Sequence, residues 1–255
     1  MPLSHLPAFL ATAFDALANW LDKRSAARVP LLLLGILFAK GRRTVTSWFR
    51  AAGVTTDFRQ GYVTVCSIGR HADDMAASTL LAVRPLLGEG RLRLAIDDTP
   101  TPRYGPHVEG CGIHHDPSPG PAGEKYVYGH VWVTLSALAK HPEWGTIALP
   151  LQAQLYVRKA DLFGLPPERP RDFRTKLEMA VAQLGWAKSW VGRRFEQTWV
   201  VVDGGYAKKT FLEGAKALGF TVVSRLRKDA ALRSVPEPVE PGRKRPKLHF
   251  ARMTQ

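Results

Sequence analysis

The chain has 255 residues, 45% of them hydrophobic and 23% charged, a globular composition that excludes wholesale disorder. Its 36 Lys and Arg residues exceed its 22 Asp and Glu residues, and the net charge of +14 favours nucleic acid as a partner. The longest apolar stretch, residues 29–39, is too short for a bilayer, and 2 cysteines do not make a disulfide scaffold. Since the start of the chain also lacks a signal-peptide pattern, we expect a cytoplasmic protein that does not associate with a membrane.

Residues 1–88 are predicted to form an all-helical region. Apolar residues at helical spacing indicate helices over residues 6–21, 29–39, 44–53 and 73–83. The second helix is apolar all round, which is typical of a central buried helix, and Thr44 or Thr46 is expected to cap the third. A basic turn leads into this third helix, which carries Arg50. The spacing suits a DNA-contacting helical pair or a plain helical hairpin equally well.

A strand pattern begins at Arg91. Apolar, β-prone runs predict strands over residues 91–97, 126–138, 146–157, 198–203 and 221–227, with helices over 173–191 and 207–219 and a loop over 100–123. The order β-β-β-α-β-α-β predicts the α/β class, in the form of a mixed sheet with helices packed on it. Residues 234–255 read as a Pro-rich basic tail, which either touches phosphates or is solvated.

Carboxylates follow two of these strands at the point where each strand ends. Asp97 and Asp98 close the first strand, and Asp203 comes directly after three valines. A charge at the rim of an apolar strand needs a partner or a metal ion, and two such rims side by side would suit Mg²⁺. Strand-end aspartates also form turns or cap helices, as Asp203 would for a helix beginning near Ala207.

The two adjacent aspartates are expected to face opposite sides of the sheet, because successive strand residues alternate. They therefore cannot both point at one metal ion. Asp98 shares its side with Leu92, Leu94 and Ile96, but parity alone does not tell which side carries the site.

Long stretches of the chain resemble the catalytic domain of DDE transposases of bacterial insertion sequences. They cover residues 95–133, 149–162, 173–180, 199–212 and 222–233, including AIDDT and WVVVDGGY. The resemblance spans most of residues 91–233, and residues 30–90 are similar to that family's helical N-terminal region. It implies three parts: a helical DNA-binding region (1–88), an RNase H-like catalytic domain (91–233) and the tail (234–255).

The resemblance also implies an activity, a site and partners. The activity is metal-dependent DNA strand cleavage and transfer, with Mg²⁺ or Mn²⁺. The family's first catalytic aspartate precedes Thr in a D-D-T or E-D-T motif and is here Asp98, while the second closes the V-V-D strand and is here Asp203. Both are expected to be catalytic residues and metal ligands. The implied partners are double-stranded DNA, as element ends and target, and a second copy of the chain, at the nucleoid of a bacterium.

The family's third acidic residue is a Glu in a Y-x2-R-x3-E-x6-K signature on a late helix, and no such signature follows Asp203. Glu237 and Glu240 are the acidic residues of the tail, but both lie in a proline-broken segment, so the role is assigned to neither. We therefore expect an incomplete transposase without the final catalytic helix. The alternative is a catalytically inactive, DNA-binding remnant or a regulator of an intact transposase.

A second group of polar side chains lies in the loop after the first strand. Five potential metal ligands occur within ten positions: His107, Cys111, His114, His115 and Asp116. Their spacing matches no standard zinc pattern, so a loop beside the DNA or the active site is favoured over a zinc site.

Overall fold

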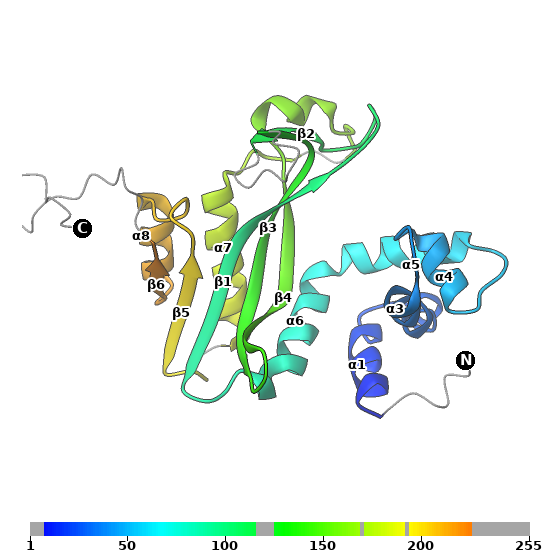
Figure 1. Ribbon diagram of the computed structural model, residues 1–255, viewed down its shortest axis with the longest axis horizontal. Coiled ribbons are helices and arrows are strands. Elements are labelled where there is room, and N and C mark those ends of the chain that lie inside the picture. The colour runs from blue at the N-terminus through cyan, green and yellow to red at the C-terminus, as the bar shows by residue number, and fades with distance from the viewer. Residues whose placement is uncertain (1–7, 116–124, 169–170, 192–193, 226–255) are drawn as a thin grey trace, which may run out of the picture.

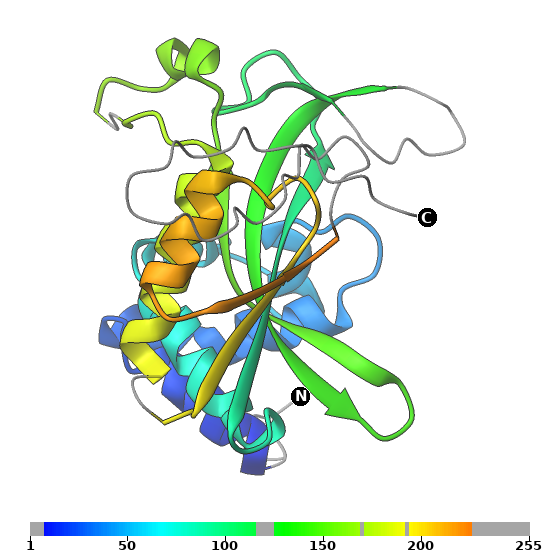
Figure 2. The same cartoon turned by 90° about the vertical axis from the view of Figure 1, so that its left-hand side faces the viewer.

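A computed structural model describes residues 8–115, 125–168, 171–191 and 194–225 of the chain. In this part, a group of N-terminal helices lies at one side of a mixed sheet, and later helices cover a face of the sheet (Figures 1 and 2). The expected α/β class and the preceding all-helical region are confirmed. The boundaries between the three parts stay predictions, and the tail from residue 234 lies outside the described residues.

The N-terminal region is helical throughout its described length. Its helices are α1 (Ala8–Ala18), α2 (Lys23–Ala26), α3 (Val29–Phe38), α4 (Val45–Ala51), α5 (Arg59–Arg70) and α6 (Ala72–Val83), followed by the 3-10 turn η2 (Arg84–Leu86). Thr44 rather than Thr46 caps α4, through a reciprocal capping box with Ser47. Helix α5 was not predicted from the sequence, because its glycines and β-branched residues have weak helix propensity.

Helix α3 is only partly the buried helix that its composition predicts. Val29 and Leu32 are buried, but Leu37 and Phe38 at its end are 63% and 62% exposed. The helix lies close to α4 at Gly35, where an added Cβ would stand 2.0 Å from the carbonyl oxygen of Trp48. Within the described ranges, no helix is long and apolar enough to cross a bilayer.

The sheet is built around its first strand. The strands are β1 (Arg91–Pro102), β2 (Gly112–His115), β3 (Tyr126–His141), β4 (Gly145–Tyr156), β5 (Gln197–Val202) and β6 (Thr221–Ser224). Their spatial order is β2-β3-β1-β5-β6, and β4 also pairs with β3. Strand β1 runs antiparallel to β3 and parallel to β5, which in turn runs parallel to β6. The 3-10 turn η3 (Lys159–Gly164) and helices α7 (Lys176–Val191) and α8 (Lys209–Ala217) complete the described elements.

Strand β1 continues five residues beyond its expected end. It pairs with β5 only as far as Ile96, but with β3 as far as Pro102. No described strand pairs with the other edge of this continuation. Pro100 and Pro102, which lack a backbone N–H, are therefore tolerated there. The short strand β2 likewise falls within the range expected to be a loop, and it pairs with the start of β3.

The core lies between the sheet and helices α7 and α8. Leu92, Leu94 and Ile96 of β1 are buried there, together with Leu184 of α7 and Phe211 of α8. The intervening residues of β1 are partly exposed on the other side of the strand. This alternation continues past Ile96 and places the next residue of the same parity, Asp98, at the rim of the core.

The helical region is fastened to the sheet by a side-chain hydrogen bond. Asp73 lies in the first turn of α6, and its Oδ1 accepts a hydrogen bond of 2.6 Å from Nε2 of Gln152 on β4. Gln152 is buried while Asp73 is exposed, so the bond lies at the surface of the contact between the two parts.

We expect Leu94→Ala to lower the free energy of unfolding by about 3 kcal/mol, because it leaves a cavity in a fully buried part of the core. Urea denaturation followed by circular dichroism measures the change. Leu86→Ala is the matched control, since Leu86 is 58% exposed and its truncation is expected to cost no more than about 0.5 kcal/mol. Equal losses in the two variants would contradict this description of the core.

Candidate active site

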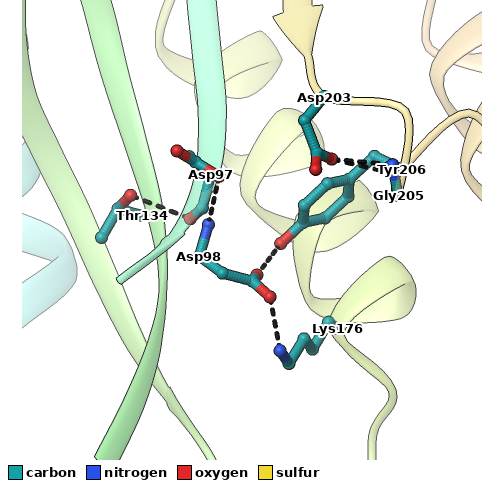
Figure 3. Close-up of polar contacts among 7 residues, drawn as sticks. All are labelled: Asp97, Asp98, Thr134, Lys176, Asp203, Gly205 and Tyr206. Atoms are coloured by element: carbon teal, nitrogen blue, oxygen red, sulfur yellow. Dashed lines mark hydrogen bonds and ion pairs between the residues drawn. The ribbon is translucent and has the colours of Figure 1, made fainter. Parts of the chain in front are cut away.

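The carboxylates that sequence analysis singled out gather at one edge of the sheet. Strands β1 and β5 are parallel neighbours, and Ile96 is in register with Val202. Asp97 and Asp98 therefore continue β1 beside the point where Asp203 continues β5. Figure 3 shows Asp98 and Asp203 next to Tyr206, with the carboxylate of Asp97 turned away from it. The carboxyl ends of adjacent parallel strands are where α/β sheets commonly bind ligands.

Asp98 faces the helix-covered side of the sheet, and both of its carboxylate oxygens have protein partners. Oδ2 forms an ion pair with Nζ of Lys176, the first residue of α7, and Oδ1 accepts a hydrogen bond from the hydroxyl of Tyr206 (Figure 3). The side chains of Asp98 and Lys176 are 29% and 33% exposed, so the ion pair lies at the boundary between core and solvent. Two charge-assisted contacts fix the orientation of this carboxylate.

Helix α7 is held firmly against the strand that pairs with Asp98. The fully buried Gln183 donates a hydrogen bond of 2.9 Å from Nε2 to the carbonyl oxygen of Val133, and Val133 is in register with Asp98. At the start of the helix, Oε2 of Glu178 accepts hydrogen bonds from the backbone N–H and the hydroxyl of Thr175. These bonds set the place from which Lys176 reaches the site.

Asp203 shapes the turn that follows β5. Its Oδ1 accepts hydrogen bonds from the backbone N–H groups of Gly205, at 2.9 Å, and Tyr206, at 3.3 Å. Glycine is favoured at position 205, because an added Cβ would stand 3.1 Å from that same oxygen. Helix α8 starts later, with Lys208 as its N-cap, so Asp203 is a turn former and not the cap of this helix.

Tyr206 is the buried centre of the site. Its side chain is 4% exposed and packs edge-to-face on Phe211, with 5.7 Å between ring centroids. Burial, the hydrogen bond to Asp98 and the surrounding negative charges raise the pKa of the Tyr206 phenol well above its usual value. The hydroxyl is therefore protonated at neutral pH and donates its hydrogen bond to Asp98.

Asp97 points to the opposite side from Asp98, as parity predicts, and remains electrostatically coupled to the site. Its Oδ1 accepts a hydrogen bond of 2.8 Å from the backbone N–H of Asp98. Partial desolvation, followed by the charges of Asp203 and Asp98, raises the pKa of Asp97 above its usual value. The edge of the sheet therefore carries an excess of negative charge.

The donor chemistry of this edge fits a hard divalent cation. Mg²⁺ takes one or two protein carboxylates and completes its shell with water and substrate phosphates, and Asp98 and Asp203 supply ligands of that kind. Besides desolvation, the charges of Asp203 and Asp98 contribute to the raised pKa of Asp97, and a cation would offset that part. In the described part of the chain, no group of three or more His, Cys, Asp or Glu residues is arranged to hold a metal ion. Glu237 and Glu240 lie outside that part.

The ligand types between His107 and Asp116 do not form a zinc cluster among the described residues. His114 is buried on β2 against Tyr156, and its Nε2 has no hydrogen-bond partner there. His115 alternates to the other side of β2 and packs on Tyr126, while Asp116 lies outside the described residues.

A groove of about 730 Å³ lies beside the start of α7. Its walls come from the junction of α5 and α6, from β3 and β4, and from the segment before α7. Trp132 of β3 lines it, and this residue is in register with Thr99, directly after Asp98. The segment before α7 contributes the exposed Arg171 and Arg174 along with Asp172. The groove thus combines a basic rim with an aromatic side chain of β3, and none of Asp97, Asp98 and Asp203 lines it.

Sequence analysis named Asp98 and Asp203 but missed the two residues that hold Asp98. Lys176 lies 78 positions from Asp98 and Tyr206 lies 108 positions away, so no local pattern connects them. The one available signal was their presence in the transposase-like stretches, at residues 173–180 and 199–212.

Comparison with known proteins gives one family. The family model of the DDE superfamily endonucleases matches residues 16–254, which is nearly the whole chain. No curated protein matches the chain significantly. The match takes in the helical region as well as the sheet that carries Asp98 and Asp203.

We expect Asp97→Asn to stabilise the fold at neutral pH in buffer free of divalent cations. Because the pKa of Asp97 is raised, the folded state binds its proton more tightly than the unfolded state does. The protonated carboxyl therefore stabilises the folded state at low pH, and this stabilisation is lost as pH rises through that pKa. Asn removes the charge and its Oδ1 can still accept the N–H of Asp98. Urea midpoints should therefore be higher in the variant at pH 7 and converge with wild type below about pH 4.

Asp15→Asn on α1 is the control for removing one negative charge from the protein as a whole. An Asp97→Asn variant whose urea midpoint at pH 7 equals or falls below that of wild type would contradict the electrostatic description of the site.

Proposed function

Since the chain belongs to the DDE superfamily endonucleases, we propose that it is the transposase of a bacterial insertion sequence and cleaves and transfers DNA strands. Enzymes of this superfamily act on DNA and generally use divalent metal ions. The observation that carries the proposal is the meeting of Asp98 and Asp203 at the ends of two adjacent parallel strands. Both residues match the family's catalytic aspartates by motif.

In this proposal Asp98 and Asp203 are the catalytic residues and hold Mg²⁺ or Mn²⁺. When bound, such ions activate the attacking water or 3′-hydroxyl and stabilise the leaving oxygen of a phosphodiester. The chain's own residues prepare the site: Tyr206 and Lys176 orient Asp98, and the turn at Gly205 orients Asp203. The third acidic residue of the family is assigned to no described residue.

The DNA partner is supported by charge and by the groove beside the site. The chain carries a net charge of +14, and Arg171 and Arg174 stand at the rim of the groove next to α7. Phosphates bound there would bring a strand towards Asp98. In this proposal the helical region binds the ends of the element. The protein acts together with a second copy of the chain, at the nucleoid in the bacterial cytoplasm.

We expect the full chain to nick supercoiled DNA in Mg²⁺ or Mn²⁺, and both Asp98→Asn and Asp203→Asn to lower the nicking rate by about 100-fold or more. Gel analysis of relaxed circles over time measures the rates. Asp172→Asn, which removes a nearby carboxylate from the groove, is the matched control and should stay within about threefold of wild type. Nicking that needs no metal ion, or that survives in both aspartate variants, would refute the proposal.

A second candidate function is DNA binding without cleavage, as an inactive remnant or a regulator of an intact transposase. The observation that favours it is the lack, among the described residues, of a three-membered group of metal-ligating side chains. It predicts that the chain retains DNA equally well with and without Asp203→Asn and nicks under no metal condition.

We expect the double variant Arg171→Ala, Arg174→Ala to weaken DNA binding and to flatten its salt dependence. Each lost phosphate contact removes roughly one unit from the slope of log K against log salt, so the slope should fall by about two. Fluorescence anisotropy with a labelled duplex at several salt concentrations measures it. Arg84→Ala is the control, because Arg84 lies in η2, before the start of β1 and outside the residues that line the groove. An unchanged slope in the double variant would show that the DNA binds elsewhere.

A further inference from the structure

We propose that Lys176 is a built-in counter-ion that occupies Asp98 until a divalent cation displaces it, and that it thereby sets the metal affinity of the site. This inference rests on the proposed function, because it takes Asp98 as a metal ligand. Lys176 is in this view a positioning residue that acts through Asp98. Its ammonium and the metal ion compete for one carboxylate oxygen.

The competition follows from how the oxygens of Asp98 are shared. The Tyr206 hydroxyl donates to Oδ1, and the Lys176 ammonium pairs with Oδ2. Tyr206 is 4% exposed and its ring packs on Phe211, so its hydroxyl is held in place beside Oδ1. Lys176 is one-third exposed and ends a flexible chain, so it is the partner that gives way.

The placement of the ammonium is built into the start of α7. Glu178 caps the helix by accepting two hydrogen bonds from Thr175, which precedes Lys176. Gln183 anchors the same helix to β3 at the register of Asp98. A lysine at the first position of a helix fixed at both points reaches Asp98 without any adjustment of the backbone.

The charge of the site explains why a counter-ion is needed. Asp97 and Asp98 are consecutive residues of β1, and Asp203 follows Val202, which pairs with Ile96, so three carboxylates meet at this edge with Lys176 paired to one of them. The ammonium thus partly neutralises the edge of the sheet when no metal ion is bound. A divalent cation would bring twice the charge to the same carboxylate oxygens, which are ligands that Mg²⁺ and Mn²⁺ prefer.

An aromatic ring also contacts the ammonium while it is paired with Asp98. Nζ of Lys176 lies 5.3 Å from the centroid of the Tyr156 ring, within the range of a cation–π contact. Tyr156 ends β4, so the ammonium lies between β1 and β4 and is held near Asp98 from both sides.

The test is a Mn²⁺ titration of the full chain without DNA, followed by the electron paramagnetic resonance signal of the free ion. Lys176→Met keeps the length of the side chain but removes its charge, and it should bind Mn²⁺ roughly tenfold more tightly than wild type. Lys176→Arg keeps the charge and should bind no more tightly than wild type. Lys209→Met is the matched control, because Lys209 forms an exposed ion pair with Glu213 on α8 and should leave the Mn²⁺ affinity unchanged.

Two further variants separate this inference from the proposed function. Asp98→Asn should abolish the tight Mn²⁺ site. If wild type and Asp98→Asn bind Mn²⁺ equally, Asp98 is not a metal ligand, and both the metal site of the proposed function and this inference are wrong. If wild type has that site but Lys176→Met binds Mn²⁺ equally or more weakly, only the counter-ion role is overturned. Circular dichroism spectra and thermal melts of each variant confirm that it is folded before titration.

Discussion

The parallel pairing of β1 with β5 is the constraint on which the site depends. Residues from distant parts of the sequence become neighbours because Ile96 and Val202 are in register, and a carboxylate follows on each strand where this pairing stops. The buried valines of β5 and the buried leucines of β1 fix this register, since a slip by one residue would turn every core side chain outward. Burial of apolar side chains in the core therefore positions the charges, rather than interactions among the charged groups themselves.

The site itself shows how a fold tolerates clustered negative charge. One carboxylate is held by a buried phenol and an ammonium, another is used to shape a turn, and the third lies on the more exposed side of the sheet. Each arrangement reduces repulsion by a different means. Together they keep the oxygens oriented without saturating them, because each carboxylate oxygen has more than one lone pair.

Much of the fold could be predicted from local patterns, and the contacts of the site could not. Period-two alternation located β1, apolar and β-prone runs located β3, β4, β5 and β6, and parity correctly put Asp98 on the side of Leu94. The extension of β1 through Pro100 was missed because its tolerance depends on where β5 stops, which is a property of the sheet. Lys176 and Tyr206 were missed for the same reason: they meet Asp98 through helix packing and a tight turn far along the chain. Whether Asp98 and Asp203 are catalytic stays a prediction.

The turn after β5 positions a carboxylate of the site but contributes little to the core. A side chain at position 205 would stand 3.1 Å from Oδ1 of Asp203, so any substitution there displaces the carboxylate, while the core residues around Val200 and Phe211 are untouched. A substitution in this turn can thus move one charge while the core stays packed. Sequence changes at the turn and in the core therefore act on different properties of the protein, the first on the placement of a carboxylate and the second on the stability of the fold.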